Sequence, residues 1–206
     1  RDLTAVYGSI PIDGVEIDPK IIDVGRRYFD MSEPNLNAIA QDGRYYITTT
    51  NKKYDIIGID AYRQPYIPFH LTTKQFFQEV RDHLSPNGVA VINAGRTETD
   101  YRLVDVISST MKAVFPNVYV IDLPSPQINS ILVGTNQPTQ LGDFAANASS
   151  FTNPILRQVA ATALNQGRVR EVQPSGVVFT DDWAPVEKVI DEIILGYARS
   201  GSGEIR

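Results

Sequence analysis

Residues 12–28 read IDGVEIDPKIIDVGRRY, a strand signal followed at once by a helix signal. The run from Ile12 to Ile17 is rich in β-branched residues, as a short strand requires. Asp18 followed by Pro19 is typical of a helix N-cap with proline at the first helical position. Apolar residues then recur with helical spacing at Ile21, Val24 and Tyr28. The stretch predicts a strand, a tight turn and an amphipathic helix.

The same alternation continues along the chain. Further strand candidates are residues 37–40, 55–59, 89–92, 118–121 and 130–133. Helical apolar stripes lie at Phe76, Val80 and Leu84 and at Val104, Ile107, Met111 and Val114, and residues 154–164 and the segment from Pro185 also read as helices. Alternating strands and helices predict an α/β fold, a Rossmann-like, mostly parallel sheet with helices on both faces.

Length and composition place the chain among globular domains. At 206 residues it suits one domain with a small appendage. We expect a Rossmann-like nucleoside-binding and catalytic domain over residues 1–136. A C-terminal helical extension over residues 137–206 would pack on the same domain and end in a frayed tail at 200–206. Arg1 stands where a gene product would carry Met, so we expect the chain to begin within a longer protein.

Composition also excludes several classes of site. Cysteine is absent and only His70 and His83 offer imidazoles, which argues against a metal centre. The net charge of −5 has no basic block behind it, which argues against a nucleic-acid partner. No apolar run approaches the roughly 18 residues that cross a bilayer. A small-molecule partner is the better expectation.

Three acids stand at the ends of successive predicted strands: Glu16, Asp42 and Asp60. Ligands of open α/β sheets bind beyond the carboxyl ends of the strands. Glu16 can accept hydrogen bonds from both ribose hydroxyls, or it is a solvated strand-end residue. Asp42, before Gly43, can cap the next helix or accept a hydrogen bond from an exocyclic amine such as that of adenine. Asp60 opens a loop with no helix to cap, which favours a functional role.

Three carboxylates converging on one crevice would repel each other unless a cation lay between them. A sulfonium ligand or a polyamine provides that cation. A phosphate-rich dinucleotide would need basic or Gly-rich compensation that this segment does not show. Charge therefore favours an S-adenosyl compound over NAD.

Four motifs, in order, resemble those of the spermidine synthase family of polyamine aminopropyltransferases. They are GVEIDP at 14–19, QDGR at 41–44, YDIIGID at 54–60 and LSPNG at 84–88, and the resemblance extends over roughly residues 1–136. The segments IPFHLTT at 67–73 and FTDDWAPVE at 179–187 look more like the spermidine-synthase-like domains that are fused to membrane segments.

The resemblance implies a role for each matching residue. Glu16 would bind the ribose, Asp42 and Gly43 would face the adenine, and Asp60 would be the catalytic base. Other candidate substrate contacts are Tyr62, Arg63 and His70. Arg63 stands where family synthases carry a second acid, so it would repel a diamine. His70 also precedes a predicted helix that Thr72 or Thr73 can cap.

The implied reaction is transfer of an aminopropyl group from decarboxylated S-adenosylmethionine to an amine. The co-substrate is decarboxylated S-adenosylmethionine or S-adenosylmethionine, with no permanently bound cofactor. The alternatives are an S-adenosylmethionine-dependent methyltransferase and a non-catalytic nucleoside-binding module of a membrane-fused protein. We expect a cytoplasmic protein, with a membrane tether upstream and a homo-oligomer both compatible with the sequence. The central strand and Gly-rich loop of the family would lie upstream, so these 206 residues alone should be inactive and bind adenosyl ligands poorly.

Overall fold

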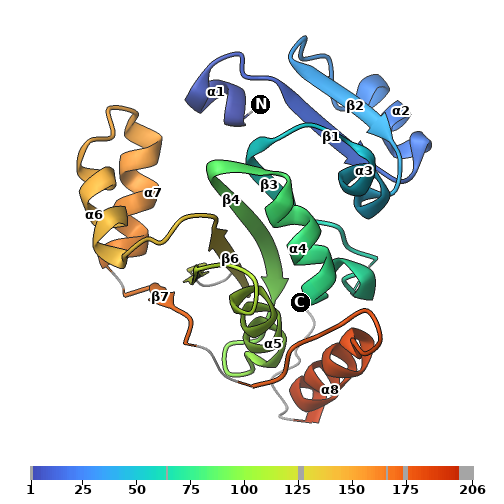
Figure 1. Ribbon diagram of the computed structural model, residues 1–206, viewed down its shortest axis with the longest axis vertical. Helices are drawn as coiled ribbons and strands as arrows, with labels where there is room; N and C mark the ends of the chain where they lie inside the picture. The colour runs from blue at the N-terminus through green and yellow to red at the C-terminus, as the bar shows by residue number, and fades with distance from the viewer. Residues whose placement is uncertain (1, 64, 125–127, 166, 174–175, 200–206) are drawn as a thin grey trace. The chain divides into compact units, whose positions relative to one another are not determined.

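The computed structural model describes residues 2–63, 65–124, 128–165, 167–173 and 176–199 (Figure 1). The chain forms two compact units, residues 1–51 and 52–206. The predicted division at residues 136 and 137 stays a prediction, and the predicted tail at 200–206 lies outside the described residues. Within the described ranges, no helix is long and apolar enough to cross a membrane.

The first unit is a two-stranded parallel sheet with short helices. Its elements are α1 (Asp2–Tyr7), β1 (Ile12–Glu16), α2 (Pro19–Tyr28), β2 (Leu36–Ala40) and α3 (Gly43–Thr49). The side chain of Asp18 accepts a hydrogen bond from the Lys20 N–H at 2.8 Å, and Pro19 is the first helical residue. The predicted cap is therefore confirmed. Because β1 and β2 are parallel, with Glu16 beside Ala40, their carboxyl ends lie at the same edge.

The second unit is a five-stranded sheet with helices. Its strands are β3 (Tyr54–Ile59), β4 (Leu84–Gly95), β5 (Asn117–Asp122), β6 (Asn129–Thr135) and β7 (Val169–Glu171). Its helices are η1 (Phe69–Leu71), α4 (Lys74–Asp82), α5 (Arg102–Lys112), α6 (Leu141–Ser149), α7 (Pro154–Asn165) and α8 (Val186–Arg199). The spatial order is β3-β4-β6-β5-β7. β3 and β4 are parallel as predicted, whereas β6 lies antiparallel between β4 and β5.

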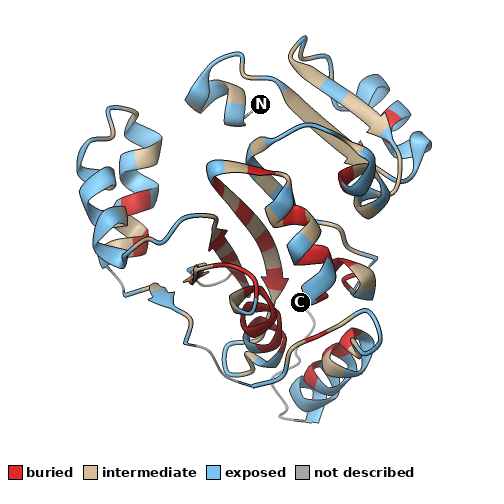
Figure 2. Cartoon of the chain, in the orientation of Figure 1, coloured by how far each residue is buried: buried red, intermediate tan, exposed pale blue. Residues whose placement is uncertain are grey.

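The core of this unit lies where α5 covers the sheet (Figure 2). Along the second half of β4 every other residue is buried, which is the period of a strand with one face on a core. Val104, Ile107 and Met111 of the predicted α5 stripe are completely buried. Both α8 and α4 contact α5, so these three helices form one layer.

One local expectation needs correction. Leu84 was expected in the apolar stripe of a helix, but α4 ends at Asp82 and Leu84 is the first residue of β4, where the register with β3 shifts. A long-range hydrogen bond also joins two loops of this unit: Asp181 accepts from the Thr73 hydroxyl at 2.6 Å, and Thr73 is the N-cap of α4.

Candidate functional site

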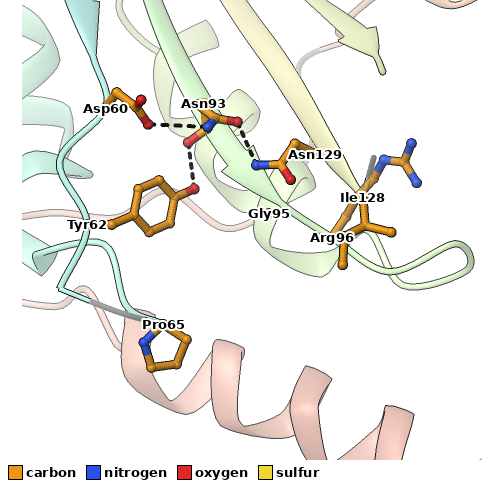
Figure 3. Close-up of a pocket in the computed structure, with 8 residues that line it drawn as sticks. All are labelled: Asp60, Tyr62, Pro65, Asn93, Gly95, Arg96, Ile128 and Asn129. Carbon is orange, nitrogen blue, oxygen red and sulfur yellow. Dashed lines mark hydrogen bonds between the residues drawn. The ribbon is translucent and has the colours of Figure 1, made fainter. Parts of the chain in front are cut away.

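A cavity of about 610 Å³ opens at the carboxyl end of β3 and β4 (Figure 3). It is lined by Asp60, Tyr62, Pro65, Asn93, Gly95, Arg96, Ile128 and Asn129. All of these residues belong to the second unit. They come from the loop after β3, from the end of β4 and its following residue, and from the start of β6. Parallel β3 and β4 end at the same edge, and antiparallel β6 begins there. The topology therefore brings the three segments together.

Asp60 is the carboxylate of the cavity. It directly follows β3 and is exposed, and its Oδ1 accepts a hydrogen bond from Asn93 Nδ2 at 3.2 Å. Asn93 Oδ1 in turn accepts a hydrogen bond from Asn129 Nδ2 at 2.8 Å. Figure 3 shows this row of side chains across β3, β4 and β6. A carboxylate held by one donor and open to solvent can accept a proton from a ligand.

Tyr62 joins the loop after β3 to the end of β4. Its hydroxyl donates to the main-chain carbonyl of Asn93 at 2.8 Å. Burial raises the pKa of the Tyr62 hydroxyl above its usual value, and the nearby Asp60 carboxylate acts in the same direction. Tyr62 is therefore a neutral hydrogen-bond donor at physiological pH and lines the cavity with the predicted base.

Arg96 also lines the cavity, but its guanidinium points away from Asp60 (Figure 3). It donates to Ser130 Oγ at 3.1 Å, to the Thr97 carbonyl at 3.0 Å and to the Leu123 carbonyl at 3.2 Å. It also lies over the Tyr101 ring, with the guanidinium carbon 4.8 Å from the centroid. These contacts fix the turn after β4 against the start of β6. Arg96 therefore shapes the wall of the cavity.

Arg63 and His70, predicted as substrate contacts, are not among the described residues that line this cavity. Arg63 is exposed, and its main chain pairs with that of Tyr66 in an isolated bridge. His70 lies in η1, edge-on to the Phe69 ring, three residues before Thr73, the N-cap of α4. Their roles toward a substrate stay predictions.

The other predicted site residues lie at the sheet edge of the first unit. Glu16 ends β1, and its Oε1 accepts a hydrogen bond from the Asp18 N–H at 2.9 Å. Asp42 is the N-cap of α3, where its Oδ1 accepts from the Tyr45 N–H at 2.9 Å, and Gly43 is the first residue of that helix. Capping thus explains one oxygen of Asp42. Since Asp60 belongs to the other unit, the convergence of the three carboxylates stays a prediction.

Neither Asn93 nor Asn129 was predicted as a site residue from the sequence. Asn93 directly follows the predicted strand 89–92, as Asp60 directly follows the predicted strand 55–59, and this position was the signal that could have revealed it. Asn129 immediately precedes the predicted strand 130–133 and gives no comparable signal, because its place beside Asn93 depends on where β6 inserts.

Comparison with known proteins adds independent findings. The family model described as "Spermine/spermidine synthase domain" matches residues 9–140. A protein of Bifidobacterium longum named "Probable polyamine aminopropyl transferase" is 30% identical over 218 residues, which cover 96% of this chain and 48% of the relative. The chain therefore spans about half the length of this curated relative.

Two solved structures share the fold. A probable spermidine synthase from Corynebacterium glutamicum has a TM-score of 0.62 at 24% identity, covering 86% of this chain and 68% of its own. Human methyltransferase-like protein 13, solved in complex with SAH, has a TM-score of 0.57 at 23% identity, covering 90% and 81%. The Rossmann-like α/β fold of class I S-adenosylmethionine-dependent methyltransferases, predicted from the sequence, is confirmed.

Proposed function

The chain belongs to the spermine/spermidine synthase family, and from that membership we propose that the protein transfers an aminopropyl group from decarboxylated S-adenosylmethionine to an amine. The observation that supports this most directly is the placement of Asp60. Its carboxylate follows a strand, lines a cavity and is held by Asn93, with no helix beginning immediately after it. This is the arrangement that a base needs.

The chemistry explains why a base is needed. An alkylamine with a pKa near that of lysine, about 10.4, is neutral in only about one molecule in 2,500 at pH 7, equivalent to about 4.6 kcal/mol. In the proposed step the amine nitrogen bonds to the carbon of the aminopropyl group that is attached to sulfur. The carbon–sulfur bond breaks, its electron pair stays on sulfur, and methylthioadenosine leaves. Asp60 accepts the proton that the nitrogen loses and orients the amine.

The co-substrate would be held by residues of the first unit. We assign the ribose hydroxyls to Glu16, where one carboxylate oxygen already accepts the Asp18 N–H and the other is the acceptor for a sugar hydroxyl. The adenine is assigned to Asp42 and Gly43, at the start of α3. Tyr62 is the substrate contact that the cavity supports, while the substrate contacts of Arg63 and His70 stay predictions.

Family membership also supports a cytoplasmic location and a small-molecule amine as the partner. The upstream membrane tether and the homo-oligomer stay predictions. The fold shared with human methyltransferase-like protein 13 keeps methyl transfer as the alternative, because one fold hosts both chemistries.

The deciding experiment compares decarboxylated S-adenosylmethionine with S-adenosylmethionine as the donor for the full-length protein and a panel of amines. Formation of methylthioadenosine from the decarboxylated donor supports the proposal. Turnover of S-adenosylmethionine alone would establish the methyltransferase instead. Binding of either nucleoside without turnover would favour the non-catalytic nucleoside-binding module. Asp60→Asn is the control that ties any turnover to this site.

A further inference from the structure

The row of side-chain amides behind Asp60 has a direction. Asn129 donates from Nδ2 to Asn93 Oδ1 at 2.8 Å, and Asn93 donates from Nδ2 to Asp60 Oδ1 at 3.2 Å. Each hydrogen bond crosses from one strand segment to its neighbour in the sheet, from β6 to β4 to the end of β3. All three residues belong to the same compact unit.

The direction matters because a primary amide has a donor side and an acceptor side. Turned over by half a rotation, Asn93 would face Asp60 with its carbonyl oxygen and place two acceptors against each other. The Asp60 carboxylate can only accept, so it takes the N–H side of Asn93, and Asn129 donates to the oxygen that this orientation presents on the other side. Asn129 therefore stabilises the orientation of Asn93 in which a donor faces the carboxylate.

We infer that Asn129 is a positioning residue of the reaction, acting on Asp60 through Asn93. This inference rests on the proposed function, since it assigns Asp60 as the base. Asn93 occupies one carboxylate oxygen and sets the plane of the group, which leaves Oδ2 as the oxygen that takes the amine proton. The main chain of Asn93 is itself held by the Tyr62 hydroxyl at 2.8 Å.

A double-mutant cycle in the full-length protein tests the inference. We expect Asn129→Ala to lower kcat by about 5- to 20-fold with KM within about twofold, since displaced catalytic groups cost rate rather than ground-state binding. If Asn129 acts through Asn93, the double variant with Asn93→Ala should be within about twofold of Asn93→Ala alone. Two effects that multiply, or a rise in KM with kcat unchanged, would overturn the inference and make Asn129 an independent residue or a direct substrate contact.

Asn117→Ala is the matched control. Asn117 lies on β5 of the same sheet, and its side chain donates to Glu171 Oε1 at 2.6 Å, outside the set of residues that line the cavity. The variant removes this hydrogen bond and the one that Asn117 Oδ1 accepts from the Thr139 N–H at 3.0 Å. We expect its kcat to stay within about twofold of the unmodified protein, and an equal loss in both variants would count against a specific role for Asn129.

A second measurement does not depend on turnover. In a ¹⁵N–¹H spectrum, the pair of signals from the Asn93 side-chain NH₂ group is identified as the pair that Asn93→Ala removes. These two signals should shift in Asn129→Ala and keep their positions in Asn117→Ala. An unmoved pair in Asn129→Ala would overturn the inference. A shifted pair without turnover of any amine would support the hydrogen-bond chain and count against the proposed function alone.

Discussion

The Tyr62 hydroxyl donates to the main-chain carbonyl of Asn93 across 2.8 Å, so the loop that follows Asp60 is fastened to the strand that supplies the donor for Asp60. Two hydrogen bonds thus hold this pair of residues. The Asn93 amide donates to the side chain of Asp60, and the Tyr62 hydroxyl donates to the main chain of Asn93. Each contact can be removed separately, which makes the assignments testable one at a time.

Asp60→Asn keeps the size of the side chain and its capacity for hydrogen bonds but cannot accept the amine proton. In the full-length protein we expect kcat to fall by about 10²- to 10⁴-fold, the usual range for loss of a general base. Nucleoside affinity, measured by calorimetry with methylthioadenosine, should change far less. Glu16→Gln should show the opposite pattern. A kcat within about threefold of the unmodified protein would mean that Asp60 is not the base.

Tyr62→Phe should lower the free energy of unfolding at pH 7 by about 1 kcal/mol, because the variant loses one hydrogen bond. The pKa of Tyr62 is raised in the folded state, so its contribution is complete below the unfolded value, about 10, and disappears as the pH rises through the folded value. The difference between the proteins in urea unfolding should therefore shrink above about pH 10. Tyr28→Phe, at a residue 75% exposed, is the control and should show no such trend.

Arg63→Asp should strengthen the binding of diamines through long-range electrostatic attraction. Arg63 is exposed and is not among the described residues that line the cavity, so we expect no direct contact. Unit charges about 8 to 12 Å apart interact by about 1 to 2 kcal/mol at an effective dielectric of 20. Solvent exposure reduces this, and we expect KM for diamines to fall by about three- to tenfold at low salt. Arg63→Gln should give about half the effect in free energy.

The salt dependence of KM distinguishes a long-range effect of Arg63 from direct contact with the amine. The screening length falls from about 10 Å at 0.1 M to about 3 Å at 1 M, so the gain from Arg63→Asp should vanish in high salt. A gain that persists at 1 M salt would instead indicate direct contact between residue 63 and the amine.

Arg96→Lys should lower the free energy of unfolding by about 2 to 3 kcal/mol, measured by urea titration. The Arg96 side chain is only 8% exposed, and a lysine cannot reproduce its planar set of donors to Ser130 and two carbonyls. Arg157→Lys, at an exposed position of α7, should stay within about 0.5 kcal/mol. Equal stability of the two variants would show that Arg96 contributes no more than a surface residue.

Gly134→Ala tests the packing of β6 on α5 and its C-terminal extension. A methyl group at this position would lie 2.6 Å from Phe115 Cδ2, closer than Cβ atoms approach other atoms, and 3.1 Å from Met111 Cε, which is a tight contact. We expect a loss of about 1 to 3 kcal/mol in the free energy of unfolding. Gly58→Ala on β3 meets no described atom within 4 Å and is the control. A loss in both variants alike would point to strand propensity rather than packing.

The sequence predicted those elements whose signals are local. The strand candidates at 12–17, 55–59 and 89–92 correspond to β1, β3 and β4, and the cap at Asp18 is confirmed, because each depends on neighbouring residues. α6 was not named among the individual helices, although the main-chain N–H of Gln140 donates to the Asp143 side chain at 2.7 Å at its start. The insertion of β6 between β4 and β5 is a long-range pairing that local spacing does not contain.

For the site, Asp60 was predicted from a strand that ends in acid and Tyr62 as a candidate substrate contact. Both line the cavity, and their roles stay predictions. Asn93 and Asn129 were missed because an amide acquires its role only from its hydrogen-bond partners. Those partners are set by the order of the strands, which a single sequence does not reveal.

The position of β6 also affects when the cavity can form during folding. β4 and β5 precede β6 along the chain, yet β6 separates them in the sheet, so the middle of the sheet is completed by its later segment. Such non-local pairings are slow, because loop-closure entropy must be overcome before their contacts form. Local helices of this unit can therefore be present while Asp60 still lacks its ordered partners. Catalytic activity recovered during refolding would then indicate that the sheet is complete, whereas helix content would not.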